Sequence, residues 1–264
     1  MIATTSMPSV YLPHGGGPAF FMEGGMGDMF RPMGDFLAAF HTLLPALPTA
    51  ILVVTAHWEA LVATLTGGLH PALIYDYHGF PTETYSIAYP APGAPGLAAQ
   101  AAGLLHQANI EAAVDPEYGW DHGVFIPLKV MFPQADIPVI AMSLKAGLDP
   151  NEHSAIGAAL RPLRDEGVLI VGSGMSYHNL RQLANGPASA AFDHWLDGAL
   201  GGDAAHRRAQ LAQWAAAPSG RTAHPREEHL LPLMVASGAG GDAAGRKIWR
   251  GMMGPTAVAA WAFD

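Results

Sequence analysis

The 264-residue sequence contains no cysteine and few basic residues. Without thiols the chain can form neither disulfide bonds nor the thiolate ligand sets that hold many structural zinc ions. It has 13 lysines and arginines against 22 acidic residues, which gives a formal net charge of −9. Nucleic acids and anionic membranes attract clustered basic residues. We therefore expect neither of them as a partner.

Long apolar runs are missing as well. No run approaches the roughly 20 apolar residues that a transmembrane helix needs, and the N-terminal residues lack the basic start and apolar stretch of a signal peptide. A cytoplasmic location without membrane insertion is therefore expected. The composition, with 50% hydrophobic and 13% charged residues, is typical of a compact globular protein. Because neither an internal repeat nor a charge-rich linker divides the chain, we expect residues 1–264 to form a single catalytic domain.

Histidine, glycine and proline are plentiful instead. The 13 histidines equal the lysines and arginines in number, and 31 glycines and 22 prolines indicate that much of the chain is loop. Loops on a rigid scaffold are where binding and catalytic residues concentrate. Histidines that follow a buried strand are therefore the first candidates for a functional site.

The stretch Ala50–Glu59 shows this pattern most clearly. Residues 51–54 are all apolar, which is typical of a strand buried on both faces of a parallel sheet. Ligands of open α/β sheets bind beyond the carboxyl ends of such strands, where His57 follows. A histidine buried in the core and hydrogen-bonded to backbone is the alternative, and this stretch alone does not decide between the two.

Two further strands end in the same way. The run Ser9–Leu12 leads to His14 in a glycine-rich turn, and the run Val168–Val171 leads through small residues to His178. Three independent core histidines are a poor explanation for three such junctions. His229 begins an apolar helical run and is expected to face inward. His122 stands at the start of another helix, where the helix dipole disfavours its protonation, and Asp121 beside it is a candidate N-cap.

The remaining pattern predicts an α/β fold with a central, mostly parallel sheet covered by helices on both faces. Further strands are expected at 61–66, 110–114, 137–142 and 257–263, helices at 29–44, 96–107, 124–131 and 151–163 with two more within 189–214, and a turn at 246–249. The segment 74–92 is rich in aromatic residues. Tyr75, Tyr77, Phe80 and Tyr85 could line a pocket for a flat ring or simply pack against one another.

His14, His57, His178 and His229 thus form a candidate metal site, with His122 behind it. Imidazole binds Zn²⁺, Fe²⁺, Cu²⁺ and Ni²⁺, so these residues do not name the metal. Thr55, Ser176 and Asn179 are candidate hydrogen-bond partners that would fix the orientation of the imidazoles.

Five motifs in order resemble those of the class III extradiol ring-cleaving dioxygenases, in particular the single-chain 4,5-DOPA extradiol dioxygenase type. They cover nearly the whole chain and are Pro13–Pro18, Thr55–Trp58, Gly119–Gly123, Gly174–Asn179 and Glu228–Leu233. The resemblance implies one non-haem iron(II), replaced by zinc in some members, and a small catechol with O₂ as substrates.

The resemblance also implies a role for each histidine. His14, His57 and His229 would be metal ligands, although Glu228 beside His229 is an alternative third ligand because some relatives use a glutamate. His178 would be the general base, and it would lie near enough to serve as a fourth ligand as well. His122 would hydrogen-bond substrate or oxygen. The oligomeric state stays open.

Two other functions fit the residues less well. A zinc-dependent hydrolase also uses histidine ligands with an open position to activate water, but apart from Glu228 the sequence offers no conspicuous carboxylate base near the ligands. A non-catalytic, metal-binding member of the same superfamily would not need His122 and His178.

Overall fold

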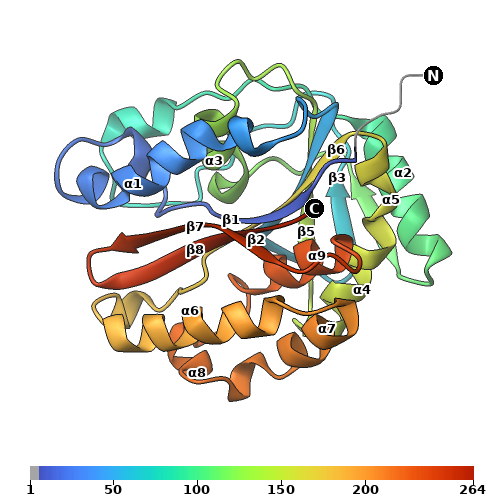
Figure 1. The fold of residues 1–264 in the computed structure, drawn as a ribbon. Helices are drawn as coiled ribbons and strands as arrows, with labels where there is room; N and C mark the ends of the chain where they lie inside the picture. The colour runs from blue at the N-terminus through green and yellow to red at the C-terminus, as the bar shows by residue number, and fades with distance from the viewer. Residues whose placement is uncertain (1–5) are drawn as a thin grey trace.

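The computed structural model describes residues 6–264 as an α/β domain around one twisted sheet (Figure 1). Residues 1–5, part of the segment where no signal peptide is expected, lie outside the described range. The eight strands of the described sheet are arranged in the order β4-β3-β5-β2-β6-β1-β8-β7. Their bounds are β1 Ser9–Pro13, β2 Ala50–Ala60, β3 Ala63–Thr66, β4 Ala112–Asp115, β5 Val139–Lys145, β6 Val168–Gly174, β7 Arg246–Met253 and β8 Thr256–Phe263.

The four central strands β5, β2, β6 and β1 are parallel, whereas β8 pairs antiparallel with β1 and β7, and β3 pairs antiparallel with β5. The expected mostly parallel sheet is confirmed. Helices cover both of its faces (Figure 1). Their bounds are α1 Gly25–Ala39, α2 Pro95–Gln107, α3 His122–Met131, α4 Pro150–Leu160, α5 Pro162–Asp165, α6 Gly186–Leu200, α7 Ala204–Ala212, α8 Gly220–Ala223 and α9 Leu231–Ala239.

Strand β2 shows why a parallel strand in this position is apolar throughout. Ile51 and Val53 point to the layer that contains α1 and α3, whereas Leu52 and Val54 point to the layer that contains α2, α4, α6 and α9. Side chains alternate between the two faces of a strand, so both sets are buried. Burial on two sides holds β2 rigidly in place.

Two expectations about local structure were wrong. Residues 246–249 form the start of strand β7 rather than a turn, because they pair with β8 over a long antiparallel ladder. Two arginines and a lysine obscure the alternation of this edge strand. The first covering helix begins at Gly25 rather than Met29 and ends at Ala39, and a 3₁₀ turn follows over Phe40–Leu43.

The sheet order brings the ends of three strands together. Strand β6 lies between β2 and β1, with Thr55 opposite Ser173 and Pro13 opposite Gly174. The residues that follow these positions therefore leave the sheet at one edge. Strand β2 continues to Ala60 beyond a register shift between Val54 and Glu59, so His57 lies within the strand rather than after its end. Such an irregularity turns side chains away from the regular direction of the ladder.

In the part of the chain that the structure describes, no helix combines the length and apolarity needed to cross a bilayer.

Close packing of α9 on β6 gives a test of this architecture. A Cβ at Gly172 in β6 would lie 2.2 Å from the backbone oxygen of Pro232 in α9. We expect Gly172→Ala to lower the free energy of unfolding by about 1–3 kcal/mol, the usual effect of overpacking. Urea denaturation measures it.

The matched control is Gly103→Ala in the interior of α2, where a Cβ meets nothing within 4 Å. Replacing a helical glycine by alanine should raise the free energy of unfolding by about 0.5–1 kcal/mol. Equal effects of the two substitutions would contradict the packing of α9 on β6.

Candidate metal centre and active site

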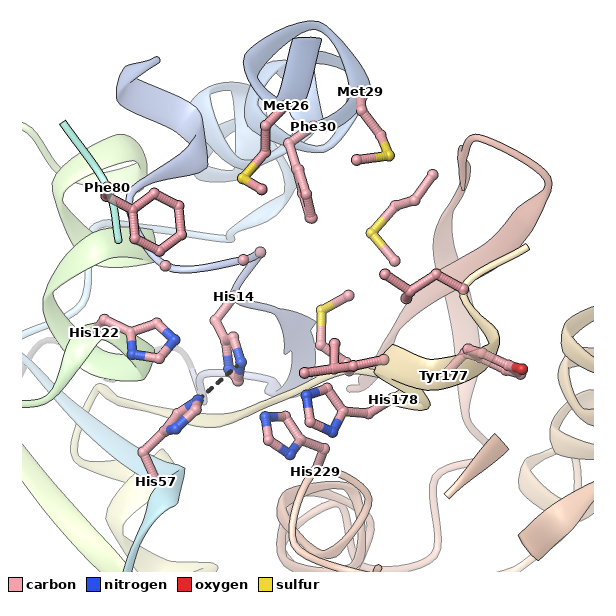
Figure 2. A pocket seen from close by; sticks show the side chains of 17 residues that line it. His14, Met26, Met29, Phe30, His57, Phe80, His122, Tyr177, His178 and His229 are labelled. Atoms are coloured by element: carbon pink, nitrogen blue, oxygen red, sulfur yellow. Dashed lines mark hydrogen bonds between the residues drawn. The ribbon is translucent and has the colours of Figure 1, made fainter. Parts of the chain in front are cut away.

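Five histidines line one pocket of about 350 Å³ at the edge where β1, β2 and β6 end (Figure 2). They are the five that the sequence singled out: His14, His57, His122, His178 and His229. His14 follows β1, His57 lies in β2 and His178 lies in the loop after β6. His122 is the first residue of α3, and His229 lies in the turn before α9. The sheet and the starts of two helices thus hold the cluster together.

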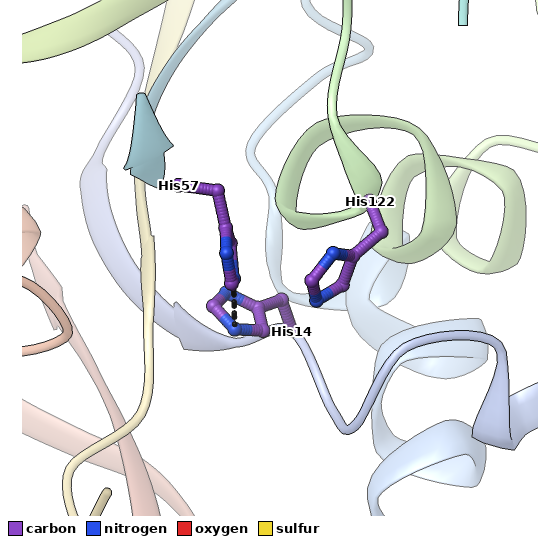
Figure 3. Close-up of side chains that lie close together, drawn as sticks. All are labelled: His14, His57 and His122. Atoms are coloured by element: carbon purple, nitrogen blue, oxygen red, sulfur yellow. Dashed lines mark hydrogen bonds between the residues drawn. The ribbon is translucent and has the colours of Figure 1, made fainter. Parts of the chain in front are cut away.

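His14 and His57 approach each other through their ring nitrogens, with their Nε2 atoms 3.2 Å apart (Figure 3). Together with His122 they offer three ligand atoms that all lie within 4.8 Å of one another. The ring of His229 has its centroid 5.2 Å from that of His14 and 4.9 Å from that of His57. These imidazoles therefore face a common space.

A second group adjoins the first through His229. His178, Glu228 and His229 also offer ligand atoms within 4.8 Å of one another. The rings of His178 and His229 are stacked, with centroids 3.3 Å apart. Both rings turn Nδ1 towards Glu228 Oε1, at 3.6 Å from His178 and 3.0 Å from His229. His229 therefore belongs to both groups, and Glu228 lies behind the two rings.

Hydrogen bonds fix which nitrogen of His14 carries the proton. Ser173 Oγ donates to the backbone oxygen of Gly123, so its only proton is used. Its contact of 3.1 Å with His14 Nδ1 therefore requires Nδ1–H to donate and Ser173 to accept. The lone pair of His14 is left on Nε2, which faces the other rings.

Carboxylates fix His122 and His229 in the same way. Asp76 Oδ1 lies 2.7 Å from His122 Nδ1 and also accepts the backbone N–H of His122. Glu228 Oε1 lies 3.0 Å from His229 Nδ1. An ionised carboxylate can only accept, so both Nδ1 atoms donate and both Nε2 atoms keep a lone pair.

Burial keeps His14, His57 and His229 uncharged. It lowers the pKa of His57 to about 2 and that of His229 to about 4, and it lowers the pKa of His14 well below 6.5. Repulsion between neighbouring imidazoles adds to the effect on His14 and His57. Neutral imidazoles are the form that binds a metal ion.

The carboxylates behind the rings stay ionised for a different reason. Burial raises the pKa of Glu228, but hydrogen bonds from His178 and His229 outweigh it and leave the pKa far below 4.5. Burial likewise raises the pKa of Asp76, and its bonds to His122 reverse the effect. Asp76 and Glu228 are therefore ionised hydrogen-bond acceptors for the Nδ1–H groups of His122 and His229.

The donor set fits a transition-metal ion. Within the described chain, the Nε2 atom of His229 is buried and has no hydrogen-bond partner, which is costly unless something else takes its lone pair. Several neutral imidazoles with lone pairs converging on one space are typical ligands of Zn²⁺ or Fe²⁺. Metal binding would satisfy this buried nitrogen.

The sequence pattern did not indicate Asp76 and Ser173 as hydrogen-bond partners of the histidines. Asp76 lies between two tyrosines in the aromatic segment, and no spacing marked it as a partner of His122. Ser173 belongs to β6, and only the register with β1 brings it to His14. The residues expected in such roles act elsewhere: Thr55 donates to Asp121, Ser176 accepts from the N–H of Ala259, and Asn179 donates to the oxygen of Thr222. That expectation was wrong.

Of the four aromatic residues proposed as a pocket wall, only Phe80 lines the pocket. Tyr75, Tyr77 and Tyr85 pack against one another and donate to backbone oxygens, which is the alternative stated above. Asp121 is confirmed as the N-cap of α3, where it accepts the N–H of Gly123. His224, which directly follows α8, is fully buried against Phe192 and Trp214.

The lowered histidine pKa values predict acid sensitivity of the metal-free protein. Unfolded histidines have a pKa near 6.5, so below this pH the unfolded chain binds more protons than the folded chain. Stability should therefore be full above about pH 6.5 and fall by up to about 1.4 kcal/mol per pH unit for each such histidine below it. Urea denaturation at several pH values measures the slope.

His57→Gln should make this slope shallower. His78→Gln, at an exposed position outside the cluster, is the control and should leave the slope unchanged. A free energy of unfolding that does not fall from neutral pH to about pH 5 would contradict the burial of His14, His57 and His229 as neutral imidazoles.

The sequence of this chain is similar to those of ring-opening dioxygenases, which fits a metal-binding pocket lined by histidines. The family model described as the catalytic LigB subunit of aromatic ring-opening dioxygenase matches residues 1–261. A 4,5-DOPA dioxygenase extradiol of Portulaca grandiflora is 38% identical over 240 residues, which cover 89% of this chain and 86% of the relative. The dioxygenase tasH of Hapsidospora irregularis is 38% identical over 251 residues, covering 88% of this chain and 78% of the relative.

A solved structure has the same fold. The crystal structure of an uncharacterized protein from Escherichia coli K12 superposes with a TM-score of 0.78 and 30% sequence identity, covering 98% of this chain and all of that one. The family model spans nearly the whole chain, including all five histidines of the pocket. This chain therefore belongs to the family of aromatic ring-opening dioxygenases represented by the catalytic LigB subunit.

Proposed function

We propose that residues 1–264 act as one catalytic domain, an extradiol dioxygenase that opens the ring of a catechol with O₂ at a single non-haem iron(II). The observation that carries this proposal is the convergence of five histidines on one pocket, three of them with their Nδ1 protons committed to fixed acceptors. The names of the relatives support the same reaction. The cytoplasmic location stays a prediction from the sequence.

His14, His57 and His229 are the proposed iron ligands. The Nε2 atoms of His14 and His57 already approach each other, and the Nε2 atom of His229 is buried without a partner. Glu228 is better suited to orient His229 than to bind the ion, because its Oε1 atom contacts Nδ1 of both His178 and His229. When bound, iron(II) supplies a Lewis acid and a place where catechol and O₂ can meet.

His178 is the proposed general base. It lines the pocket, is partly exposed to it, and has a carboxylate, Glu228, on its far side. A catechol must lose a hydroxyl proton to chelate a metal through both oxygens. His178 Nε2 accepts that proton, and the negative charge of Glu228 stabilises the resulting imidazolium. Its stacking on His229 also leaves it available as a fourth ligand.

His122 is proposed to hydrogen-bond substrate or oxygen across the pocket. Asp76 holds its Nδ1–H, so Nε2 points towards the rings of His14 and His57. The same carboxylate would stabilise a protonated His122. His178 or His122 would return a proton to the reacting oxygen as the ring opens. Overall, both oxygen atoms of O₂ would enter the product, a ring-opened semialdehyde.

Two alternatives account for less of the site. A zinc-dependent hydrolase would use the same imidazoles to activate water, but the family model is that of a ring-opening dioxygenase. A non-catalytic, metal-binding member of the same superfamily would not need His122 and His178, which line the pocket. The oxygenase gives each of the five histidines a role.

Oxygen uptake tests the proposed reaction. After anaerobic loading with iron(II), addition of an unsubstituted catechol and O₂ should consume oxygen and give a yellow ring-opened product, because iron changes oxidation state and can activate O₂. Zinc does not change oxidation state, so the zinc-loaded protein is the control. Uptake with iron that is no greater than with zinc would overturn the oxygenase proposal.

Metal analysis of single variants tests the ligand set. We expect His229→Ala to lose most of the bound iron, because the substitution removes a proposed ligand. Residues that only hydrogen-bond to a ligand typically change metal affinity by about 10–100-fold. Glu228→Ala should therefore weaken binding without abolishing it, and His122→Ala serves as the variant of a pocket histidine that is not a proposed ligand. Full iron content in His229→Ala with loss in Glu228→Ala or His122→Ala would move the third ligand to that residue.

A further inference from the structure

The pocket has two chemically different sides (Figure 2). The histidines occupy one side. Across the space, α1 contributes Met26, Met29 and Phe30, with Phe80 beside them. Leu183 and Met253 also line the pocket. The wall that faces the metal-binding side is therefore built from methionine, leucine and phenylalanine.

Among the described residues that line this pocket there is no lysine, arginine, aspartate or glutamate. Arginines do line a neighbouring surface hollow that shares His178 and Leu180 with this pocket, but two of them form ion pairs with glutamates. Arg226 binds both carboxylate oxygens of Glu59, and Arg221 lies 2.7 Å from Glu227. Arg181 is the remaining cation of that hollow. No charged side chain of the wall could thus pair with an ionised substrate group.

The apolar character continues to the mouth of the pocket. Leu180, Met26 and Met29 line it and are 69%, 38% and 37% exposed. Exposed apolar residues gathered at one opening indicate a surface that another apolar group covers. Methionine side chains are flexible and adapt to ligands of different shape. The opening therefore suits an apolar substituent longer than the ring itself.

We propose that the catechol substrate carries an uncharged apolar substituent, which lies against α1 while the two ring hydroxyls face the histidines. This inference rests on the proposed dioxygenase function and narrows its substrate class. A carboxylate or a zwitterionic amino-acid group would lose its hydration in this pocket without gaining a counter-charge, which is unfavourable. An alkyl group gains free energy from the same burial, corresponding to about fourfold in affinity per buried methylene.

Three substrates of matched length test this preference. 4-Propylcatechol ends in a methyl group, dihydrocaffeate has the same three-carbon chain ending in a carboxylate, and DOPA ends in an amino-acid group. Unsubstituted catechol is the reference for ring opening itself. With the iron-loaded protein, kcat/KM for 4-propylcatechol should exceed that for dihydrocaffeate and DOPA by at least about tenfold, which corresponds to about 1.4 kcal/mol.

A pair of variants at the pocket mouth tests where the substituent lies. Met29→Arg places a cation on α1, and it should raise the ratio of kcat/KM for dihydrocaffeate to that for 4-propylcatechol by about tenfold. Met29→Leu is the matched control that keeps an apolar side chain, and it should retain the wild-type preference. An unchanged ratio in Met29→Arg would show that the substituent lies elsewhere.

Anaerobic calorimetric titration gives a readout that does not depend on turnover. Burial of the propyl chain should make the heat-capacity change more negative for 4-propylcatechol than for catechol. If catechol is not turned over, the proposed function fails, and the titration still decides this inference. If catechol is turned over but DOPA or dihydrocaffeate is preferred, this inference is wrong and the dioxygenase stands. If Arg181→Ala then loses the preference for the charged substrate, Arg181 is the residue that binds the substrate carboxylate.

Discussion

The hydrogen bonds behind the imidazole rings decide what this pocket can bind. Ser173, Asp76 and Glu228 each accept a hydrogen bond from the Nδ1–H of a different histidine. Because each ring has only one other nitrogen, the lone pair must lie on Nε2 on the opposite side. Burial also keeps the rings of His14 and His229 neutral. The charge and direction of the donor set are therefore fixed before any ion arrives.

The sheet makes this arrangement possible. Strands β2, β6 and β1 are neighbours in space although they are far apart in the sequence, and their parallel register brings Thr55, Ser173 and Pro13 to one edge. Buried on both faces, these strands cannot shift without disturbing both layers of helices. Helices α3 and α9 add His122 and His229 at their N-terminal ends. A rigid framework thus positions residues from five separate segments.

The sequence predicted the parts of the site that follow from a single strand. A continuous apolar run followed by a histidine is visible locally, so His14, His57 and His178 could be found without the fold. The partners of the imidazoles could not, because they depend on register and loop path. Ser173 reaches His14 only through the pairing of β6 with β1, and Asp76 lies in a loop without regular structure. Strand β7 was missed because charged side chains interrupt its apolar alternation.

The pocket has a histidine side and an apolar side formed largely by α1. In the proposed reaction the histidines would face the two hydroxyls of a catechol, and α1 would contact the substituent of the ring. The position of the proposed iron ion decides whether a bound ring would lie between the histidines and the apolar side of the pocket. Anomalous X-ray diffraction at the iron edge from crystals of the iron-loaded protein should show one peak per chain, about 2.1 Å from Nε2 of His14, His57 and His229. A peak bound by Glu228, or two separate peaks, would contradict the account.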